Sequence, residues 1–314
     1  MHYIGIDVGG TKIAIGLFNE QRELVSKSKI PTDKELSAEK LNDSITEEID
    51  KLLSAKSLTR KDVGGIGIGC PSTVNFKTGI VNWTNNIPHL SNFNLKEYYE
   101  KKFGCRTIAD NDANLAALAE YRRGAGRGHD NMMYCTASTG IGGGFILDGK
   151  LYRGANGYAG ESGHSIITPK SGVQCSCGNY GCIESYASGS NLSKHVKNRL
   201  EKGEKTIMTE LAGGKEINGY ILAEAHKNGD AMAIELFDQI CNYMGVLLFN
   251  IYQILNLDCY VIGGGLAAGF GNELIQKTEN AFHSYIRAND DPVYFKAAEL
   301  DQDFGIIGAC EVLF

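Results

Sequence analysis

The chain has 314 residues and a formal net charge of −6 at pH 7; 43% of its residues are hydrophobic and 22% are charged. This length and composition are typical of a globular protein of one large or two medium domains, and the negative charge disfavours a nucleic-acid partner. No segment is typical of a signal peptide or a membrane span, and six of the nine cysteines are scattered as reduced thiols usually are. We therefore expect a cytoplasmic protein that binds neither nucleic acid nor membrane.

A glycine-rich hairpin is predicted at the amino terminus, where residues 3–18 read as two short strands joined at Gly9 and Gly10. Bare backbone N–H groups in such a turn, together with the Thr11 hydroxyl, can approach an anion closely, and Asp7 can hold Mg²⁺ through water. A plain hairpin turn is the alternative interpretation. A Walker loop does not fit, because it joins a strand to a helix.

Residues 37–58 have the apolar spacing of a helix, and residues 63–69 that of a strand. The asparagine-rich stretch 75–94 follows. Its amide groups suit a hydroxylated ligand such as a sugar, and they suit plain turns equally well.

Asp112 stands where a strand at residues 107–110 leads into a helix at residues 115–123. An aspartate at this place is by default an N-cap. The neighbouring Asn111 and Asn114 can orient a ligand, in which case Asp112 could accept a proton as a general base.

A second glycine-rich hairpin is predicted at residues 131–147, with a turn at residues 138–140. It repeats the plan of residues 3–18, so we expect an internal duplication with two similar turns facing a shared cleft. Two such turns can clamp a polyphosphate.

A metal-binding pattern lies between residues 161 and 184. An imidazole and three thiols in this stretch supply four ligands for a tetrahedral Zn²⁺: His164, Cys175, Cys177 and Cys182. Four protein ligands leave no open position for water, so a structural zinc is expected, holding Glu161 and Glu184 in one frame.

The remainder of the chain is predicted to be mostly helical. Residues 187–256 and 267–281 read as helices, a strand at 259–262 delivers the turn Gly263–Gly265, and residues 305–313 form a short apolar helix. On its own, a glycine turn of this kind is a weak signal for nucleotide binding.

Taken together, these motifs resemble the ROK family of bacterial sugar kinases and related repressors. The matching motifs are DVGGTK (7–12), GCPSTV (69–74), NDANLAALAE (111–120), STGIGGG (138–144), ESGH (161–164), CSCGNYGCIE (175–184) and VIGGG (261–265). The resemblance implies an α/β fold of two actin-like, ribonuclease-H-like domains with ATP in the cleft. We expect a smaller domain of residues 1–112 completed by residues 303–314, and a larger domain of residues 113–302 carrying the zinc loop.

The resemblance also implies roles for single residues. Asp112 is similar to the base that takes the proton from a sugar hydroxyl, usually that of the 6-position. Sugar ligands by this resemblance are Asn86, Asn111, Asp112, Glu161, His164 and Glu184, with His164 also binding zinc. Nucleotide-binding positions, with Mg²⁺ near Asp7, are Asp7, Gly9, Gly10, Thr11, Lys12, Thr139, Gly140, Gly263, Gly264 and Gly265. A homodimer is a further expectation from the resemblance.

The leading hypothesis is an ATP-dependent hexose 6-kinase acting on glucose. N-acetylmannosamine or N-acetylglucosamine is the alternative substrate, because the chain departs from the family's glucokinase pattern at residues 70–74 and 86–89. A sugar-sensing protein without catalysis is a different class. Family repressors carry a helix-turn-helix ahead of the first glycine motif, whereas six residues precede Asp7 here.

Overall fold

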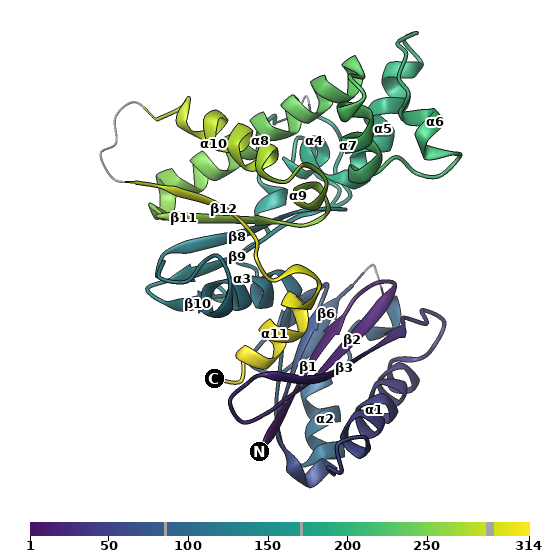
Figure 1. The fold of residues 1–314 in the computed structure, drawn as a ribbon, viewed down its shortest axis with the longest axis vertical. Helices are drawn as coiled ribbons and strands as arrows, with labels where there is room; N and C mark the ends of the chain where they lie inside the picture. The colour runs from purple at the N-terminus through teal and green to yellow at the C-terminus, as the bar shows by residue number, and fades with distance from the viewer. Residues whose placement is uncertain (85–86, 170–171, 287–291) are drawn as a thin grey trace. The chain divides into compact units, whose positions relative to one another are not determined.

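The computed structural model describes residues 1–84, 87–169, 172–286 and 292–314. The chain forms two compact units, and each is described by itself. Unit 1 comprises Met1–Arg127, Leu151–Ala159 and Glu299–Phe314, and unit 2 comprises Gly128–Lys150 and Gly160–Ala298. The colours of Figure 1 follow the chain from one unit into the other and back.

The sheet of unit 1 has five strands in the order β3-β2-β1-β4-β7. These strands are β1 (His2–Val8), β2 (Lys12–Phe18), β3 (Leu24–Pro31), β4 (Val63–Cys70) and β7 (Arg106–Asn111). The first three pair antiparallel, and β1, β4 and β7 run parallel to one another. A separate small hairpin joins β5 (Thr73–Asn75) and β6 (Ile80–Trp83). The antiparallel pairing of β1 with β2 confirms the hairpin predicted at the amino terminus.

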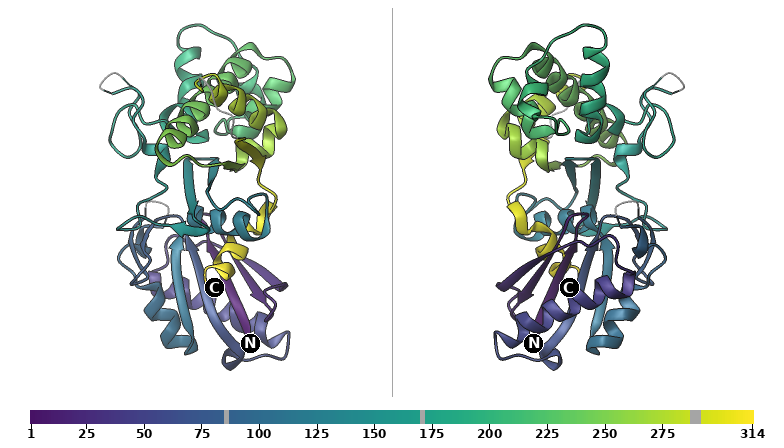
Figure 2. Two further views of the ribbon diagram at one scale, coloured as in Figure 1. Left: turned by 90° about the vertical axis from the view of Figure 1, so that its left-hand side faces the viewer. Right: turned by 90° about the vertical axis from the view of Figure 1, so that its right-hand side faces the viewer.

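Four helices accompany this sheet: α1 (Ala38–Ser54), α2 (Leu95–Phe103), α3 (Asp112–Arg123) and α11 (Phe304–Glu311). Short 3₁₀ turns lie at η1 (Arg60–Asp62), η2 (Pro88–Leu90) and η4 (Asp301–Asp303). The isoleucines of β1 and β4 pack with α1 and α2 in one apolar cluster, and α11 lies on the opposite face (Figure 2).

Glycine alternates with isoleucine in β1 and β4, so that one face of these strands is bare. A Cβ at Gly5 would lie 2.2 Å from the backbone oxygen of Ile306, and one at Gly67 would lie 1.6 Å from that of Ala309. The bare face therefore allows the backbone of α11 to contact the strands directly.

The carboxyl-terminal helix is also fastened to α3. A Cβ at Gly308 would lie 2.0 Å from the backbone oxygen of Leu115, and buried Glu311 forms ion pairs with Arg22, Arg122 and Arg123. These contacts place all of α3 in unit 1 with α11. The domain limits expected from the sequence, 1–112 with 303–314 and 113–302, stay a proposal; the compact units have different limits because α3 packs in this way.

Unit 2 repeats the topology of unit 1, with strands in the order β10-β9-β8-β11-β12. They are β8 (Met132–Ala137), β9 (Ile141–Leu147), β10 (Lys150–Tyr152), β11 (Cys259–Gly263) and β12 (Tyr294–Ala297). An antiparallel hairpin is again followed by two parallel strands. The internal duplication predicted from the two hairpins is confirmed at the level of topology.

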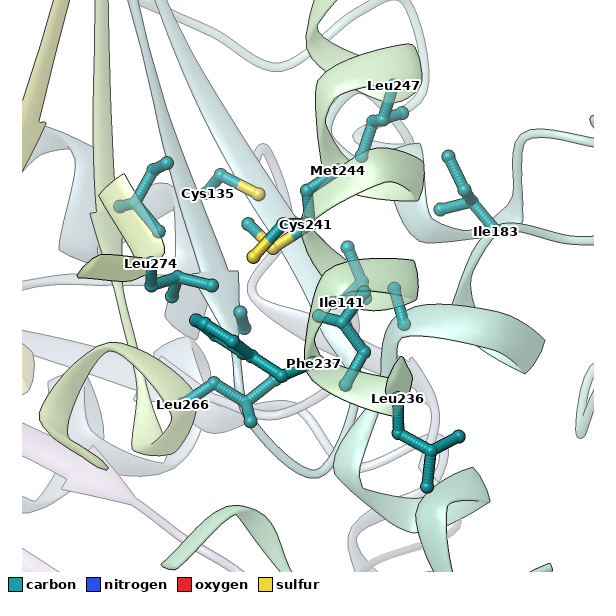
Figure 3. Packing of buried hydrophobic residues seen from close by; sticks show 14 of the residues in the cluster. Cys135, Ile141, Ile183, Leu236, Phe237, Cys241, Met244, Leu247, Leu266 and Leu274 are labelled. Atoms are coloured by element: carbon teal, nitrogen blue, oxygen red, sulfur yellow. The ribbon is translucent and has the colours of Figure 1, made fainter. Parts of the chain in front are cut away.

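The helices of unit 2 are α4 (Glu184–Ala187), α5 (Gly189–Leu200), α6 (Met208–Ala212), α7 (Gly219–Lys227), α8 (Ala231–Leu255), α9 (Gly265–Phe270) and α10 (Asn272–His283), with a 3₁₀ turn η3 (Ser162–His164). Helices α8 and α10 run side by side over the sheet (Figure 1). Figure 3 shows Phe237, Cys241 and Met244 of α8 among the buried side chains of this core, with Cys135 of β8 and Leu274 of α10.

Two sequence expectations for unit 2 need comment. The helix expected over residues 267–281 is wrong as one element, because Gly271 has φ 58° and separates α9 from α10. Among the described residues, α8 is the one helix long and apolar enough to cross a membrane, and 56% of its most apolar window is buried inside the structure. Helix α8 packs as a core helix of unit 2.

Candidate functional site

The start of helix α3 is organised by Asn111 rather than by Asp112. The Asn111 side-chain oxygen accepts hydrogen bonds from the backbone N–H groups of Ala113 at 2.9 Å and Asn114 at 3.1 Å. The interpretation of Asp112 as the N-cap is therefore wrong: Asp112 is the first residue inside the helix. The Asp112 carboxylate also accepts from the Ala113 N–H at 2.9 Å, but Asn111 accepts from both N–H groups and is the cap.

Two carboxylates of unit 1 lie at the carboxyl ends of parallel strands. Asp7 is near the end of β1, and Asp112 follows the end of β7. Cys70 lies between them in the sheet, since its neighbour Gly69 pairs with Asp7 and Cys70 itself pairs with Asn111. Burial raises the pKa of the Cys70 thiol, and the charges of Asp112 and Asp7 raise it further. This edge of an α/β sheet is where ligands usually bind.

The Asp7 carboxyl group is itself perturbed. Burial raises its pKa to about 6, against the opposing effect of Lys12 and Lys29. The turn that follows is tight, since the Gly9 N–H donates to the Lys12 carbonyl at 3.0 Å and a Cβ at Gly9 would lie 2.8 Å from that oxygen. A partly buried carboxylate beside glycine N–H groups is a chemically suitable neighbour for Mg²⁺ and phosphate.

In unit 2, the turn at residues 138–140 meets the start of α5. The N–H groups of Gly189 and Ser190 donate to the carbonyls of Ser138 at 2.7 Å and Thr139 at 3.0 Å. Gly264 has φ 92°, and a Cβ there would lie 2.6 Å from the Ala137 backbone oxygen. Only glycine fits that approach, so the turn at residues 263–265 lies directly against the end of β8.

These two turns border a cavity of about 300 Å³. It is lined by Ser138, Thr139, Gly189, Ser190, Glu216, Ile217, Asn218, Gly219, Tyr220, Gly265 and Leu266. The structure thus brings Thr139 and Gly265 together, as expected. Residues 216–220 were missed; the signal available for them was Asn218-Gly219, where Asn218 caps α7 by accepting from the N–H groups of Tyr220 and Ile221.

The predicted metal ligands come together in unit 2. The ligand atoms of His164, Cys175, Cys177 and Cys182 all lie within 4.8 Å of one another. Gly178 and Gly181 have φ values of 90° and 78° in the loop between the thiols. A three-thiol, one-imidazole set at this spacing fits a structural, tetrahedral Zn²⁺.

Glu184 connects this metal loop to the turn at residues 138–140. One carboxylate oxygen accepts from the backbone N–H of Ile141 at 3.1 Å, and the other from the Ser176 hydroxyl at 3.3 Å. A Cβ at Gly140 would lie 2.8 Å from the first of these oxygens. Glu184 therefore depends on glycine at position 140 for its place.

Glu161 lies beside the imidazole of the cluster. The two ring nitrogens of His164 face different partners. Nδ1 is 3.6 Å from the Cys175 sulfur, and Nε2 is 3.9 Å from a Glu161 oxygen. Burial raises the pKa of Glu161, the nearby His164 lowers it, and the charge of Glu184 raises it. The three groups thus form one electrostatic cluster in unit 2.

The remaining sequence predictions divide between the units. Asn111 and Asp112 belong to unit 1, and Glu161, His164 and Glu184 belong to unit 2. Asn86 lies outside the described residues. That all of them bind one sugar stays a prediction.

Comparison with known proteins identifies relatives over the full length. A family model described as "ROK family" matches residues 3–313. A glucokinase of Halalkalibacterium halodurans is 34% identical over 98% of this chain and 93% of its own. An N-acetyl-D-glucosamine kinase of Aliivibrio fischeri is 31% identical over 84% of each chain. The crystal structure of a ROK family glucokinase from Streptomyces griseus, in complex with glucose and AMPPNP, is 31% identical with a TM-score of 0.81 over 99% of both chains.

The structural match confirms the fold expected from the sequence, a two-domain actin-like α/β fold with a His/Cys₃ loop. It also accounts for the repeated hairpin and sheet order.

Proposed function

The chain belongs to the ROK family, and from this premise we propose that it transfers a phosphoryl group from ATP to the 6-hydroxyl of a hexose, with glucose as the first candidate. The observation that carries the proposal is the position of Asp112, which begins α3 while Asn111 supplies the cap. A carboxylate at this place can accept a proton from a bound hydroxyl.

Acceptor activation is assigned to Asp112. Phosphoryl transfer passes through a loose transition state, so the protein contributes chiefly by positioning and by stabilising charge. Asp112 would take the proton of the attacking hydroxyl, and Asn111, whose amide donates to the Ser72 carbonyl at 3.2 Å, would orient the same sugar. Asn86 completes this set in the proposal.

Donor binding is assigned to the glycine turns of both units. The cavity bordered by Thr139 and Gly265 is of a size and polarity that suits the nucleoside part of ATP. Gly140, Gly263 and Gly264 belong to the same two turns, and Gly264 allows the second turn to lie against the Ala137 backbone oxygen. In unit 1, the turn of Gly9, Gly10, Thr11 and Lys12 would meet the phosphates, and Asp7 would hold Mg²⁺, which neutralises phosphate charge when bound.

Sugar recognition in unit 2 is assigned to Glu161, His164 and Glu184. The Zn²⁺ held by His164, Cys175, Cys177 and Cys182 would stabilise the loop and take no part in the chemistry, since four protein ligands complete a tetrahedral site. The hydrogen bonds of Glu184 to Ile141 and Ser176 support a rigid sugar ligand beside the donor turn.

An N-acetylated amino sugar is the second candidate substrate, because a related N-acetyl-D-glucosamine kinase is 31% identical. A sugar sensor without catalysis is the candidate from another class. A cytoplasmic homodimer belongs to the proposal as well, and light scattering of the purified protein tests the oligomeric state.

The deciding experiment is an assay coupled to ADP release, with Mg·ATP and a panel of glucose, mannose, N-acetylglucosamine, N-acetylmannosamine, allose and fructose. The Asp112→Asn variant is the control for background hydrolysis. One sugar with clearly dominant kcat/KM would support the kinase and name its substrate. If no sugar gave turnover above the control while calorimetry showed sugar binding, the protein would be a sensor.

A further inference from the structure

Asp110, two residues before the proposed base, is a buried carboxylate with a complete set of partners. Its side chain is 2% exposed. One oxygen accepts from the backbone N–H of Asn111 at 2.8 Å and from the side-chain amide of Asn114 at 3.0 Å. The other oxygen accepts from Nε of Arg153 at 2.5 Å. An ionised carboxylate at such a depth requires a cation beside it.

Arg153 reaches this carboxylate from a distant part of the chain. It belongs to Leu151–Ala159, the segment of unit 1 that precedes Gly160 and Glu161 of unit 2. Its side chain is 22% exposed, and its guanidinium carbon lies 5.2 Å from the centre of the Phe76 ring. The ring and the carboxylate together hold the guanidinium in one orientation.

The partners of Asp110 lie on both sides of the proposed base. Asn111 precedes Asp112 and caps α3, while Asn114 follows it by two residues. An ion pair at Asp110 therefore restrains the peptide on which Asp112 stands. A displacement of about 1 Å at a reacting group can cost on the order of 100-fold in rate.

We propose that Arg153 is a positioning residue for phosphoryl transfer, acting through Asp110 to hold Asn111 and Asp112 at the start of α3. The inference rests on the proposed function. Arg153 is not assigned contact with the sugar or the nucleotide; its effect on the rate comes from the ionised, correctly oriented Asp110.

The test compares wild type, Arg153→Ala and Arg153→Lys in the ADP-release assay with the best sugar. We expect kcat of Arg153→Ala to fall about 10- to 100-fold, because the base loses its support, and the KM for ATP to stay within about threefold of wild type, because the proposed nucleotide-binding turns do not change. The KM for the sugar should rise by a smaller factor than kcat falls, through the loosened Asn111. Arg153→Lys keeps the charge but loses the planar fork, so an intermediate kcat is expected.

Chemical rescue separates positioning from general stability. Guanidinium chloride at low millimolar concentration should restore part of the kcat of Arg153→Ala, because the free cation can replace the missing group beside Asp110. Urea of similar shape but no charge, and sodium chloride at equal ionic strength, should not restore it.

A matched control is available in the same unit. Arg60 pairs with Asp50 at 2.6 Å and stacks 4.8 Å from the centre of the Phe103 ring, away from α3. Arg60→Ala should leave kcat and both KM values unchanged.

The possible results are distinct. If the wild type is active and Arg153→Ala has the same kcat, this inference is overturned and the kinase proposal stands. The same holds if urea rescues Arg153→Ala as well as guanidinium does. Absence of wild-type turnover would overturn both. If Arg153→Ala does not fold, Arg153→Lys decides: a kcat equal to wild type rejects the inference, and a reduced kcat with an unchanged KM for ATP supports it.

Discussion

Glu184 accepts a hydrogen bond from the backbone N–H of Ile141 at 3.1 Å. The bond joins the end of the metal loop, two residues after Cys182, to the first residue of β9 beside the turn at residues 138–140. In unit 2, the loop that carries the proposed sugar ligands and the turn that borders the cavity proposed for the nucleotide therefore share one carboxylate. A change in the metal loop should therefore displace Glu184 first.

Loss of the metal is expected to weaken sugar binding more than it slows the chemistry. Replacing Cys175 by serine, or removing Zn²⁺ with a chelator, leaves an incomplete ligand set and loosens the loop that holds Glu161, His164 and Glu184. We expect KM for the sugar to rise about tenfold or more and kcat to change less. Steady-state kinetics beside a zinc determination by atomic emission measures both.

Cys105→Ser is the control for that experiment, since Cys105 is a half-buried thiol outside the cluster. It should retain zinc and normal kinetics. Unchanged sugar affinity in demonstrably zinc-free protein would contradict the role given to the loop.

Replacing Asp112 by asparagine should abolish turnover without harming the fold. The amide cannot accept the proton, so kcat is expected to fall by about 10²–10⁴-fold while calorimetry still detects sugar binding. Because Asn111 caps α3, the melting temperature should hardly change. Asn111→Ala is the contrasting variant, with an expected loss of about 1 kcal/mol in the free energy of unfolding. A turnover near wild type in Asp112→Asn would remove Asp112 from the mechanism.

Much of this architecture could be predicted from short patterns. The two glycine hairpins predicted the duplicated sheets, and the spacing of His164 and the three thiols predicted the metal cluster, because both signals lie within a few dozen residues. The choice between Asn111 and Asp112 as the cap could not be made, since both residue types cap helices equally well.

The features that were missed depend on contacts across the chain. Asp110 and Arg153 are 43 positions apart, and residues 216–220 reach the turns at 138–140 and 263–265 only after the helices have packed. The break at Gly271 was missed because one glycine inside an apolar helical pattern does not by itself reveal a φ of 58°.

The raised pKa of Asp7 makes a prediction about stability and pH. The Asp7 carboxyl has a pKa of about 6 in the folded protein, against an ordinary value of 3.8 for an aspartate in water, so folding favours its protonated form. Its ionisation therefore destabilises the fold, and that cost is fully present above pH 6 and disappears as the pH falls towards 4. Asp7→Asn removes the cost. Without Mg²⁺ or nucleotide, we expect it to be about 2–3 kcal/mol more stable than wild type at pH 7.5 and equal to it near pH 4.

Urea unfolding at several pH values measures this difference, and Asp33→Asn at an exposed position is the control. The same Asp7→Asn variant should be inactive, because the proposed Mg²⁺ neighbour is lost. If the gain in stability did not depend on pH, burial would not be raising the pKa of Asp7 in the folded protein.

Two glycines on the bare face of β4 should respond differently to replacement by alanine: Gly67→Ala should be much more destabilising than Gly65→Ala. At Gly67, a Cβ would lie 1.6 Å from the Ala309 backbone oxygen, and a helix backbone cannot move aside locally. Gly67→Ala should therefore displace α11 and lower the free energy of unfolding by about 3 kcal/mol or more. At Gly65, two residues away on the same strand, a Cβ would meet the flexible methyl groups of Leu313 at 3.2 Å. Gly65→Ala should cost about 1 kcal/mol. Urea denaturation of the two variants compares them directly, and equal costs would mean that α11 does not rest on the bare strand backbone.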